Sequence, residues 1–194
     1  MSALYRNDRP GAHAPSWYAD SLPPSPERQG LRGDVTADVA ILGAGFTGLW
    51  AALTLARAGR RVVVLDAHRV GFGASGRNGG QVNAGFNTSQ KDLEAKLGQG
   101  EAAALWDLAE AARAQLRDFC AAHAPEASYR PGSVFAEYKP GAVDDLRAEA
   151  EHLEKRHGYR TEILDRNAIR ELVKSPLYAG GILDRGGGHV HPLA

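Results

Sequence analysis

Apolar residues form two short continuous runs near the start of the chain, separated by a stretch with helical spacing. Val39–Leu42 and Val62–Leu65 are wholly apolar, which is typical of strands buried on both faces of a parallel sheet. Between them, apolar positions over residues 47–58 recur with the period of a helix, and Gly59 is placed to end it. A strand, a helix and a strand within about 30 residues predict one βαβ unit with a right-handed crossover.

Beyond residue 82 the pattern changes, and helix-spaced stripes alternate with short β-favouring runs. The stripes predict helices over residues 89–98, 101–123, 143–158 and 166–173. The runs predict strands within residues 129–139, 161–164 and 177–183. The sequence contains no visible internal repeat and no second nucleotide-binding pattern. The fold class that we predict is α/β, a Rossmann-like βαβ unit followed by an α+β region.

Residues 1–33 lack apolar periodicity and are rich in proline. The prolines are Pro10, Pro15, Pro23, Pro24 and Pro26. Such a composition predicts an extended surface arm, with Trp17 and Tyr18 as candidate anchors. A partly ordered tail is an equally good interpretation of the same residues.

Glycines occupy the turn between the first predicted strand and the helix, in the pattern Gly43-x-Gly45-x-x-Gly48. Gly43 permits the tight turn, Gly45 lets the backbone approach a pyrophosphate, and Gly48 lets the helix pack closely on the strand. The helix N-terminus also directs N–H groups and partial positive charge at a phosphate. Asp66 ends the second strand 18 residues after Gly48, where a carboxylate can bind the hydroxyls of an unphosphorylated adenosine ribose. The alternative is a glycine-rich turn followed by a chance acid.

A second glycine-rich segment, residues 70–81, begins four residues after Asp66. Five of the ten residues from Gly71 to Gly80 are glycine, interleaved with serine, arginine and asparagine. A plain NAD dehydrogenase would begin its next helix here. The segment is suited instead to lie as backbone against a flat polar ligand, with N–H donors and an arginine for phosphate or ring oxygens. A flexible surface loop is the alternative.

The charge balance and the cysteine count exclude several classes of function. Lys and Arg together number 23, as do Asp and Glu, so no basic face or acidic tail indicates nucleic acid or an anionic membrane as a partner. Cys120 is the only cysteine, which excludes an intramolecular disulfide, and its place on the apolar side of a predicted helix indicates a buried structural thiol. No secretory leader and no run of about 18 apolar residues is visible. We therefore expect a cytoplasmic protein without a membrane span and without a metal site.

The histidines supply no evident catalytic acid or base. His123, His152 and His157 lie in or beside amphipathic helices, where solvated surface is the expected environment. His189 and His191 flank Val190 and could face one side of an extended segment, but a metal site needs a third ligand. We interpret these two as part of a structural turn.

Together these segments resemble the N-terminal half of the FAD-dependent oxidoreductases of the D-amino-acid oxidase (DAO) superfamily, with the gamma-glutamylputrescine oxidase-like branch as the most similar. The resemblance rests on residues 38–48, on Asp66 and, most specifically, on the ASGRNGGQ run at 74–81. It extends over nearly the whole chain through residues 17–18, 129–132 and 187–192.

The resemblance implies FAD as the cofactor, with the first glycine turn on the pyrophosphate, Asp66 on the adenosine ribose and residues 74–81 toward the flavin. The cofactor-binding residues that it implies are Gly43, Ala44, Gly45, Phe46, Thr47, Gly48, Asp66, Ala74, Ser75, Arg77, Asn78, Gly79, Gly80 and Gln81. It implies four segments, namely an arm (1–33), an FAD-binding βαβ unit with the flavin loop (34–82), part of a substrate domain (83–185) and the start of a return to the FAD domain (186–194). The predicted architecture is thus an incomplete DAO-type fold, as expected of an N-terminal fragment, and we expect the isolated chain to bind FAD poorly or not at all.

The resemblance also implies the reaction. The C–N bond of a small-molecule amine or amino acid is oxidised by hydride transfer to flavin N5, the imine product is hydrolysed, and oxygen or another acceptor reoxidises the flavin. It leaves the catalytic residues unidentified. Two alternatives stay open, the nucleotide-binding domain of an NAD-dependent dehydrogenase and a truncated, non-catalytic remnant.

Overall fold

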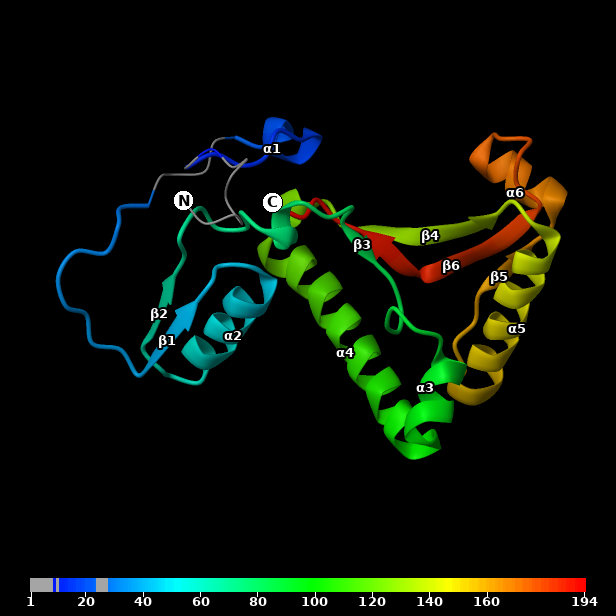
Figure 1. Ribbon diagram of the computed structural model, residues 1–194, viewed down its shortest axis with the longest axis horizontal. Helices are drawn as coiled ribbons and strands as arrows, with labels where there is room; N and C mark the ends of the chain where they lie inside the picture. Colours follow the sequence, from blue (N-terminus) through cyan, green and yellow to red (C-terminus); the bar gives the residue numbers. More distant parts are fainter. Residues whose placement is uncertain (1–8, 10, 24–27) are drawn as a thin grey trace. The chain divides into compact units, whose positions relative to one another are not determined.

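The computed structural model describes residues 9, 11–23 and 28–194, and Figure 1 follows them along the chain. Pro10, Pro24 and Pro26 of the predicted arm lie outside the described residues. The chain forms two compact units. The first comprises the described residues up to Gly79 together with His191–Ala194, and the second spans Gly80–Val190. The division into four segments that the sequence suggested stays a prediction.

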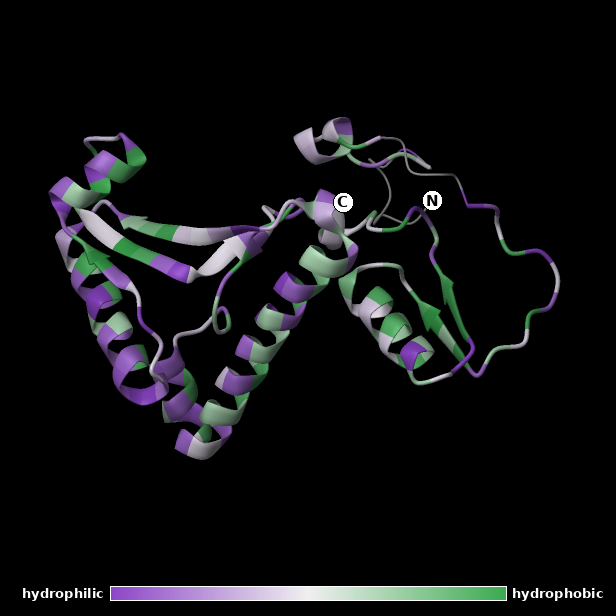
Figure 2. Ribbon diagram, turned by 180° about the vertical axis from the view of Figure 1, so that it is seen from behind, coloured by the Kyte–Doolittle hydropathy of each residue, from purple (hydrophilic) through white to green (hydrophobic). Residues whose placement is uncertain are grey.

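A βαβ motif forms the centre of the first unit, as predicted. Strand β1 (Val39–Leu42), helix α2 (Phe46–Arg57) and strand β2 (Val62–Leu65) follow one another, and the two strands are parallel and paired along their whole length. Helix α1 (Trp17–Ser21) precedes this motif, and the 3-10 turn η2 (Ala74–Gly76) follows it. Both strands are hydrophobic from end to end in Figure 2.

The burial predicted for the two strands is wrong on one face. Helix α2 covers the face that carries Val39 and Ile41, and a Cβ atom at Gly48 would come within 3.3 Å of Ile41 Cγ2. Ala40 and Leu42 alternate with these residues and are exposed, and Leu42 keeps 83% of its surface accessible. Val39, Ile41 and the residues of β2 are half-buried, because full burial of both faces of a sheet requires a layer on each side.

The second unit is built on a four-stranded antiparallel sheet with β6 (Gly180–His189) at its centre. Strand β4 (Arg130–Glu137) pairs with one edge of β6, while β5 (Glu162–Leu164) and β3 (Gln81–Val82) pair with the other. The helices of this unit are α3 (Gln90–Leu97), α4 (Gln99–His123), α5 (Pro140–His157) and α6 (Arg166–Val173), with the 3-10 turn η3 (Pro125–Ala127) after α4.

Two strands of the second unit differ from the sequence prediction. The prediction misses β3, whose two residues pair with a strand far along the chain. It also places the last strand within residues 177–183, whereas β6 spans Gly180–His189. The run Gly186–Gly188 has low intrinsic strand preference, so its strand conformation depends on partners that are distant in sequence. The helix over Arg166–Val173 is confirmed.

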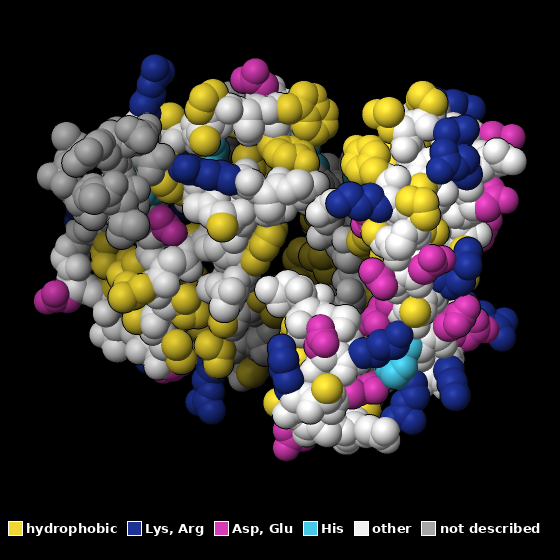
Figure 3. Space-filling model, turned by 45° about the vertical axis from the view of Figure 1, so that its right-hand side comes forward, with side chains coloured by type: hydrophobic (Ala, Val, Ile, Leu, Met, Phe, Trp, Pro, Cys, Tyr) yellow, Lys and Arg dark blue, Asp and Glu magenta, His cyan; other side chains and the backbone are white. Residues whose placement is uncertain are grey.

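Apolar side chains from the helices and the sheet form the core of the second unit. They include Ala102, Trp106, Cys120, Val143, Ala150, Leu164 and Ile169. The buried thiol predicted for Cys120 is confirmed, and burial raises its pKa. Charged side chains of both signs are present on the face that Figure 3 shows. Among the described residues, no helix combines the length and the apolar character needed to cross a membrane.

Two of the three helix histidines are packed, contrary to the prediction of solvated surface. His157 keeps only 8% of its side-chain surface accessible, because its ring stacks on Trp106 at 4.8 Å and its Nε2 lies 3.6 Å from Glu94 Oε1. His152 Nε2 lies 3.1 Å from the same carboxylate. His123, at the end of α4, is exposed as predicted. Glu94 thus joins α3 to α5 through two histidines.

Candidate FAD-binding site

The turn between β1 and α2 has the backbone geometry that the glycine pattern predicts. Gly43 has a φ of 104°, a conformation that residues with side chains rarely adopt. A Cβ atom at Gly48 would overlap the carbonyl oxygen of Gly43, so only glycine allows this close approach. Gly45 precedes α2 without a side chain that could cap the helix, and Phe46 and Thr47 are exposed in the first turn. The first amides of a helix have no partner within it, so the turn is suited to a pyrophosphate.

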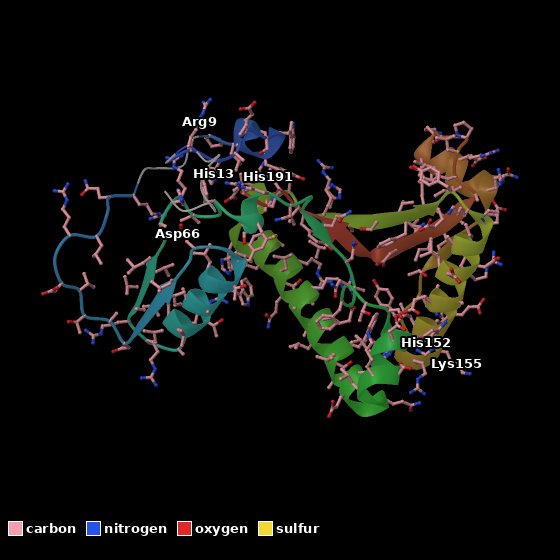
Figure 4. The ribbon with its side chains drawn as sticks, in the orientation of Figure 1. Arg9, His13, Asp66, His152, Lys155 and His191 are labelled. Carbon is pink, nitrogen blue, oxygen red and sulfur yellow. The ribbon has the colours of Figure 1, made fainter. Side chains whose placement is uncertain are left out.

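Asp66 lies at the same edge of the sheet, immediately after β2. Because β1 and β2 are parallel, their carboxyl ends meet, and Gly43 N donates to Leu65 O at 2.7 Å. Asp66 Oδ2 accepts a hydrogen bond from Ala44 N at 2.7 Å, and Oδ1 accepts one from His68 N at 2.8 Å. The residue is exposed and is labelled in Figure 4. Since each carboxylate oxygen has a second lone pair, Asp66 can accept ribose hydroxyls while it keeps both backbone contacts.

The second glycine-rich segment folds back onto this turn. Gly71 N donates to Ala44 O at 2.9 Å, and Phe46 N donates to Ser75 Oγ at 2.9 Å across 29 positions of sequence. A Cβ atom at Gly45 would lie 2.8 Å from Ser75 Oγ, so this glycine is needed for the approach as well. The structure therefore brings the two predicted cofactor segments together, with one built directly on the other.

Side chains of the second segment hold its own backbone. Arg77 Nε donates to Phe72 O at 2.8 Å, and the guanidinium carbon lies 4.5 Å from the centroid of the Phe72 ring. The ring of His68 stacks on the same phenylalanine at 4.0 Å. Asn78 Nδ2 donates to two carbonyl groups of η2, in which Ala74 is exposed. Arg77 and Asn78 thus shape the loop, and a contact of either with a flavin stays a prediction.

The last residues of the predicted cofactor segment belong to the second unit. Gly79 closes the first unit, and Gly80 opens the second. Gly80 O accepts a hydrogen bond from Val190 N at 2.8 Å, and Gln81 lies opposite His189 in the sheet. The predicted site residues therefore fall in both units, and their convergence on one ligand stays a prediction.

The sequence prediction missed His13, a residue of the arm that is labelled in Figure 4. Burial, followed by the positive charges of Arg69 and Arg77, lowers the pKa of the His13 imidazole. The arm therefore brings a histidine near two arginines of the first unit. No local pattern could reveal this proximity, because a long stretch of sequence separates His13 from both arginines. The positive charge of the two arginines favours an anionic ligand nearby, whereas the lowered pKa of His13 disfavours its charged form.

The arm is anchored through Trp17 and Tyr18, as predicted. Their rings lie 5.6 Å and 5.0 Å from the ring of His191, and Ser21 Oγ lies 3.1 Å from His191 Nε2. The arm is not extended throughout, because Ser16 caps the short helix α1. These contacts agree with the structural role predicted for His191.

His189 has a different environment from His191. It is exposed at the end of β6 in the second unit, whereas His191 belongs to the first. In the part of the chain that the structure describes, no group of three His, Cys, Asp or Glu side chains is arranged to hold a metal ion.

A protein-family model and two known proteins match most of the length of this sequence. The family model for FAD dependent oxidoreductase (DAO) matches residues 38–194. Gamma-glutamylputrescine oxidoreductase of Escherichia coli (strain K12) is 38% identical over 181 residues, and probable oxidoreductase OrdL of Rhizobium meliloti (strain 1021) is 39% identical over 179 residues. These alignments cover 93% and 92% of this chain but 42% of each relative. The chain thus spans about two fifths of the length of these relatives.

Solved structures share the fold. L-amino acid deaminase from Proteus myxofaciens matches with a TM-score of 0.65 at 20% identity, over 85% of this chain and 36% of that one. Glycine oxidase from Geobacillus kaustophilus matches with a TM-score of 0.61 at 22% identity, over 80% of this chain and 41% of that one. The family match runs from the residue before β1 to the last residue. The chain therefore belongs to the DAO family of FAD-dependent oxidoreductases.

Proposed function

We propose that this chain binds FAD and forms the N-terminal portion of an oxidoreductase that oxidises the C–N bond of a small-molecule amine or amino acid. The observation that carries the proposal is the junction at the carboxyl edge of β1 and β2. There the Gly43–Gly48 turn donates backbone hydrogen bonds to the Asp66 carboxylate and to Ser75 Oγ, and its Ala44 O accepts one from Gly71 N.

The residues at this junction fit the ADP half of FAD. A dinucleotide needs backbone amides for its pyrophosphate and a carboxylate for its adenosine ribose. Gly45 supplies no capping side chain of its own to α2, whose first amide, Phe46 N, is held by Ser75 Oγ, and Asp66 is exposed at the end of β2. A carboxylate at this position repels the 2′-phosphate of NADP and favours an unphosphorylated ribose.

The chain's own residues bind and orient the cofactor. Gly43, Gly45 and Gly48 let the backbone hold the pyrophosphate, and Asp66 accepts hydrogen bonds from the ribose. The segment that ends at Gln81 extends the backbone toward the flavin. When bound, FAD supplies the two-electron acceptor for the oxidation of the C–N bond.

The names of the relatives support the substrate class. Gamma-glutamylputrescine oxidoreductase, L-amino acid deaminase and glycine oxidase are each named for an amine or an amino acid. In the complete enzyme, oxygen or another acceptor takes the electrons from the reduced flavin. The cytoplasmic location and the poor or absent FAD affinity of the isolated chain stay predictions from the sequence.

Substitution of Asp66 tests the proposal. Asp66→Ala removes the ribose acceptor, and we expect the dissociation constant for FAD, measured by equilibrium dialysis, to rise about tenfold or more, as for other hydrogen bonds to a charged group. Asp38→Ala is the matched control, because Asp38 is an exposed carboxylate just before β1 that also accepts a backbone hydrogen bond, from Arg61 N at 2.8 Å. Equal affinity of the wild type and Asp66→Ala for FAD would contradict the proposal.

A further inference from the structure

A run of three glycines forms the last part of β6, where it pairs with the strand that follows the predicted flavin segment. Val82 lies opposite Gly188 and Gln81 opposite His189. Glycines have no side chains to pack and lose more conformational freedom than other residues when they are ordered. Other groups must therefore fix Gly186–Gly188.

We propose that Arg113, Tyr159 and Asp184 form a polar clasp that fixes this glycine run and, through it, positions the backbone of residues 80–82 for the flavin. The inference rests on the proposed function, since it assigns these three side chains as positioning residues for the FAD site. They come from α4, from the residues after α5 and from β6, and all belong to the second unit.

Asp184 is the centre of the clasp. It is 3% exposed, and its Oδ1 accepts hydrogen bonds from Tyr159 Oη at 2.6 Å and from Gly186 N at 2.9 Å. Burial, followed by the hydrogen bond to Asp184, raises the pKa of Tyr159. The phenol therefore stays protonated and can donate to the carboxylate throughout the neutral range.

Arg113 binds the carbonyl group of Gly186, whose amide is bound by Asp184. Its Nη1 donates to Gly186 O, and its Nε donates to Glu110 Oε1 at 3.1 Å. Burial lowers the pKa of Arg113, but the hydrogen bonds and charge of Glu110, with the negative charge of Asp184, raise it by more. The N–H and the C=O of Gly186 are thus both held by charged side chains, whose hydrogen bonds are stronger than neutral ones.

Other atoms lie close around the first and last glycines of the run. A Cβ atom at Gly186 would lie 2.6 Å from Tyr159 Oη and 2.8 Å from Arg113 Nη1. A Cβ atom at Gly188 would lie 2.6 Å from Arg130 O and 2.7 Å from Tyr129 Oη. Because these glycines have no side chains, the groups of the clasp can reach the backbone. The clasp in turn orders Gly186–Gly188, which would otherwise be flexible.

The pairing of β6 with β3 carries this order to the predicted flavin segment. Gly188 and His189 pair with Val82 and Gln81, and Val190 N donates to Gly80 O at 2.8 Å. β3 pairs with the sheet through Gln81 and Val82, so a shift of the glycine run would break the pairing that holds these two residues in the sheet.

Hydrogen exchange of the full chain tests the clasp without requiring FAD. Tyr159→Phe removes one hydroxyl, and Arg113→Lys keeps the charge but cannot hold Glu110 and Gly186 together. We expect the amides of Gln81, Val82 and Val190 to exchange about tenfold faster in each variant, the size typical of one lost hydrogen bond to a charged group. Amides of α6 should exchange at the wild-type rate.

Arg185→Gln is the matched control. Arg185 neighbours Asp184 on β6, but its side chain is exposed and pairs with Glu162 at 2.8 Å. This variant should keep wild-type exchange at all of these amides. Wild-type exchange at Val190 in folded Tyr159→Phe and Arg113→Lys would overturn the clasp.

Equilibrium dialysis with FAD then separates positioning from simple stabilisation. We expect Tyr159→Phe to weaken FAD binding and Arg185→Gln to leave it unchanged. Faster exchange in Tyr159→Phe with unchanged FAD affinity would overturn the positioning role. If FAD bound equally to the wild type and to Asp66→Ala while the exchange result held, the proposed function would fail and the flavin role would fail with it, whereas the clasp on β3 would stand.

Discussion

Asp66 Oδ2 accepts the amide hydrogen of Ala44 at 2.7 Å, across 22 positions of sequence. The contact joins the end of β2 to the glycine turn after β1. One carboxylate therefore shapes the turn that is proposed to hold the pyrophosphate and faces the position proposed for the ribose. The local fold of the first unit and its proposed ligand depend on the same side chain.

Asp66→Asn is expected to separate these two roles. Asparagine keeps one oxygen for Ala44 N but loses the charge and the second acceptor. We expect the first unit to lose about 1 kcal/mol of stability, measured as faster hydrogen exchange of the β1 and β2 amides, and Asp66→Ala to lose more. Identical exchange in the wild type and both variants would mean that the carboxylate does not support the turn.

Gly48→Ala is expected to disrupt the contact between α2 and β1. The added Cβ would overlap the carbonyl oxygen of Gly43, and the backbone shift should cost about 1–3 kcal/mol. Gly100→Ala is the control, because Gly100 lies in α4 with no atom within 4 Å of its Cβ position. That change should stabilise by about 0.5–1 kcal/mol. Urea unfolding measures both, and a Gly48→Ala protein as stable as the wild type would contradict the packing described.

The two faces of β1 are expected to respond differently to a polar substitution. Ile41→Ser removes a side chain that packs under α2 and should cost about 2 kcal/mol or more. Leu42→Ser alters the neighbouring residue, which is 83% exposed, and should change stability by less than about 0.5 kcal/mol. Urea unfolding of the two variants gives the comparison. Equal losses would show that Leu42 is covered in solution.

The carboxylate of Glu94 is expected to make the second unit sensitive to acid. Burial raises the pKa of Glu94, but hydrogen bonds and positive charge from His152, Arg156 and His157 lower it by more. A carboxyl whose folded-state pKa is lowered contributes stability above its ordinary pKa and loses that contribution as the pH falls through the lowered value. Glu94→Gln should therefore reduce stability by about 1 kcal/mol at neutral pH, and the difference should shrink below about pH 4.

Glu154→Gln is the control for the Glu94 variant. Glu154 lies in α5, the helix that carries the partners of Glu94, but it is exposed and pairs with the exposed Arg160 at 2.8 Å, a kind of ion pair that contributes little. Urea unfolding at several pH values compares the two variants. A pH-independent loss in Glu94→Gln would argue against an ionic role for this carboxylate.

The parts of the site that the sequence predicts are those whose signals are local. The apolar run Val39–Leu42, the spacing of Gly43, Gly45 and Gly48, and the acid after the next strand all lie within one βαβ motif. Each of these signals depends on the local backbone and needs no distant partner. The close packing predicted at Gly48 is confirmed, because a Cβ atom there would overlap Gly43 O.

The remaining features depend on contacts between distant residues. Gly186–Gly188 has the composition of a loop but forms part of a strand, in which Arg113 and Asp184 hydrogen-bond to the backbone of Gly186 and Gly188 pairs with Val82. His157 has the pattern of a solvated helix residue but stacks on Trp106. The exposure of Leu42 depends on how many layers cover the sheet. An apolar run in the sequence shows only that burial would be favourable, and it does not show which layers are present.

The most direct test of the central claim compares FAD with NAD on the wild-type chain and on Asp66→Ala. Equilibrium dialysis should give a smaller dissociation constant for FAD than for NAD, by about tenfold or more, because residues 70–81 are proposed to extend the site toward the flavin. Asp66→Ala should weaken the binding of FAD, and Asp38→Ala should not. Preference for NAD, or FAD binding that is indifferent to Asp66, would contradict the assignment of this junction as an FAD site.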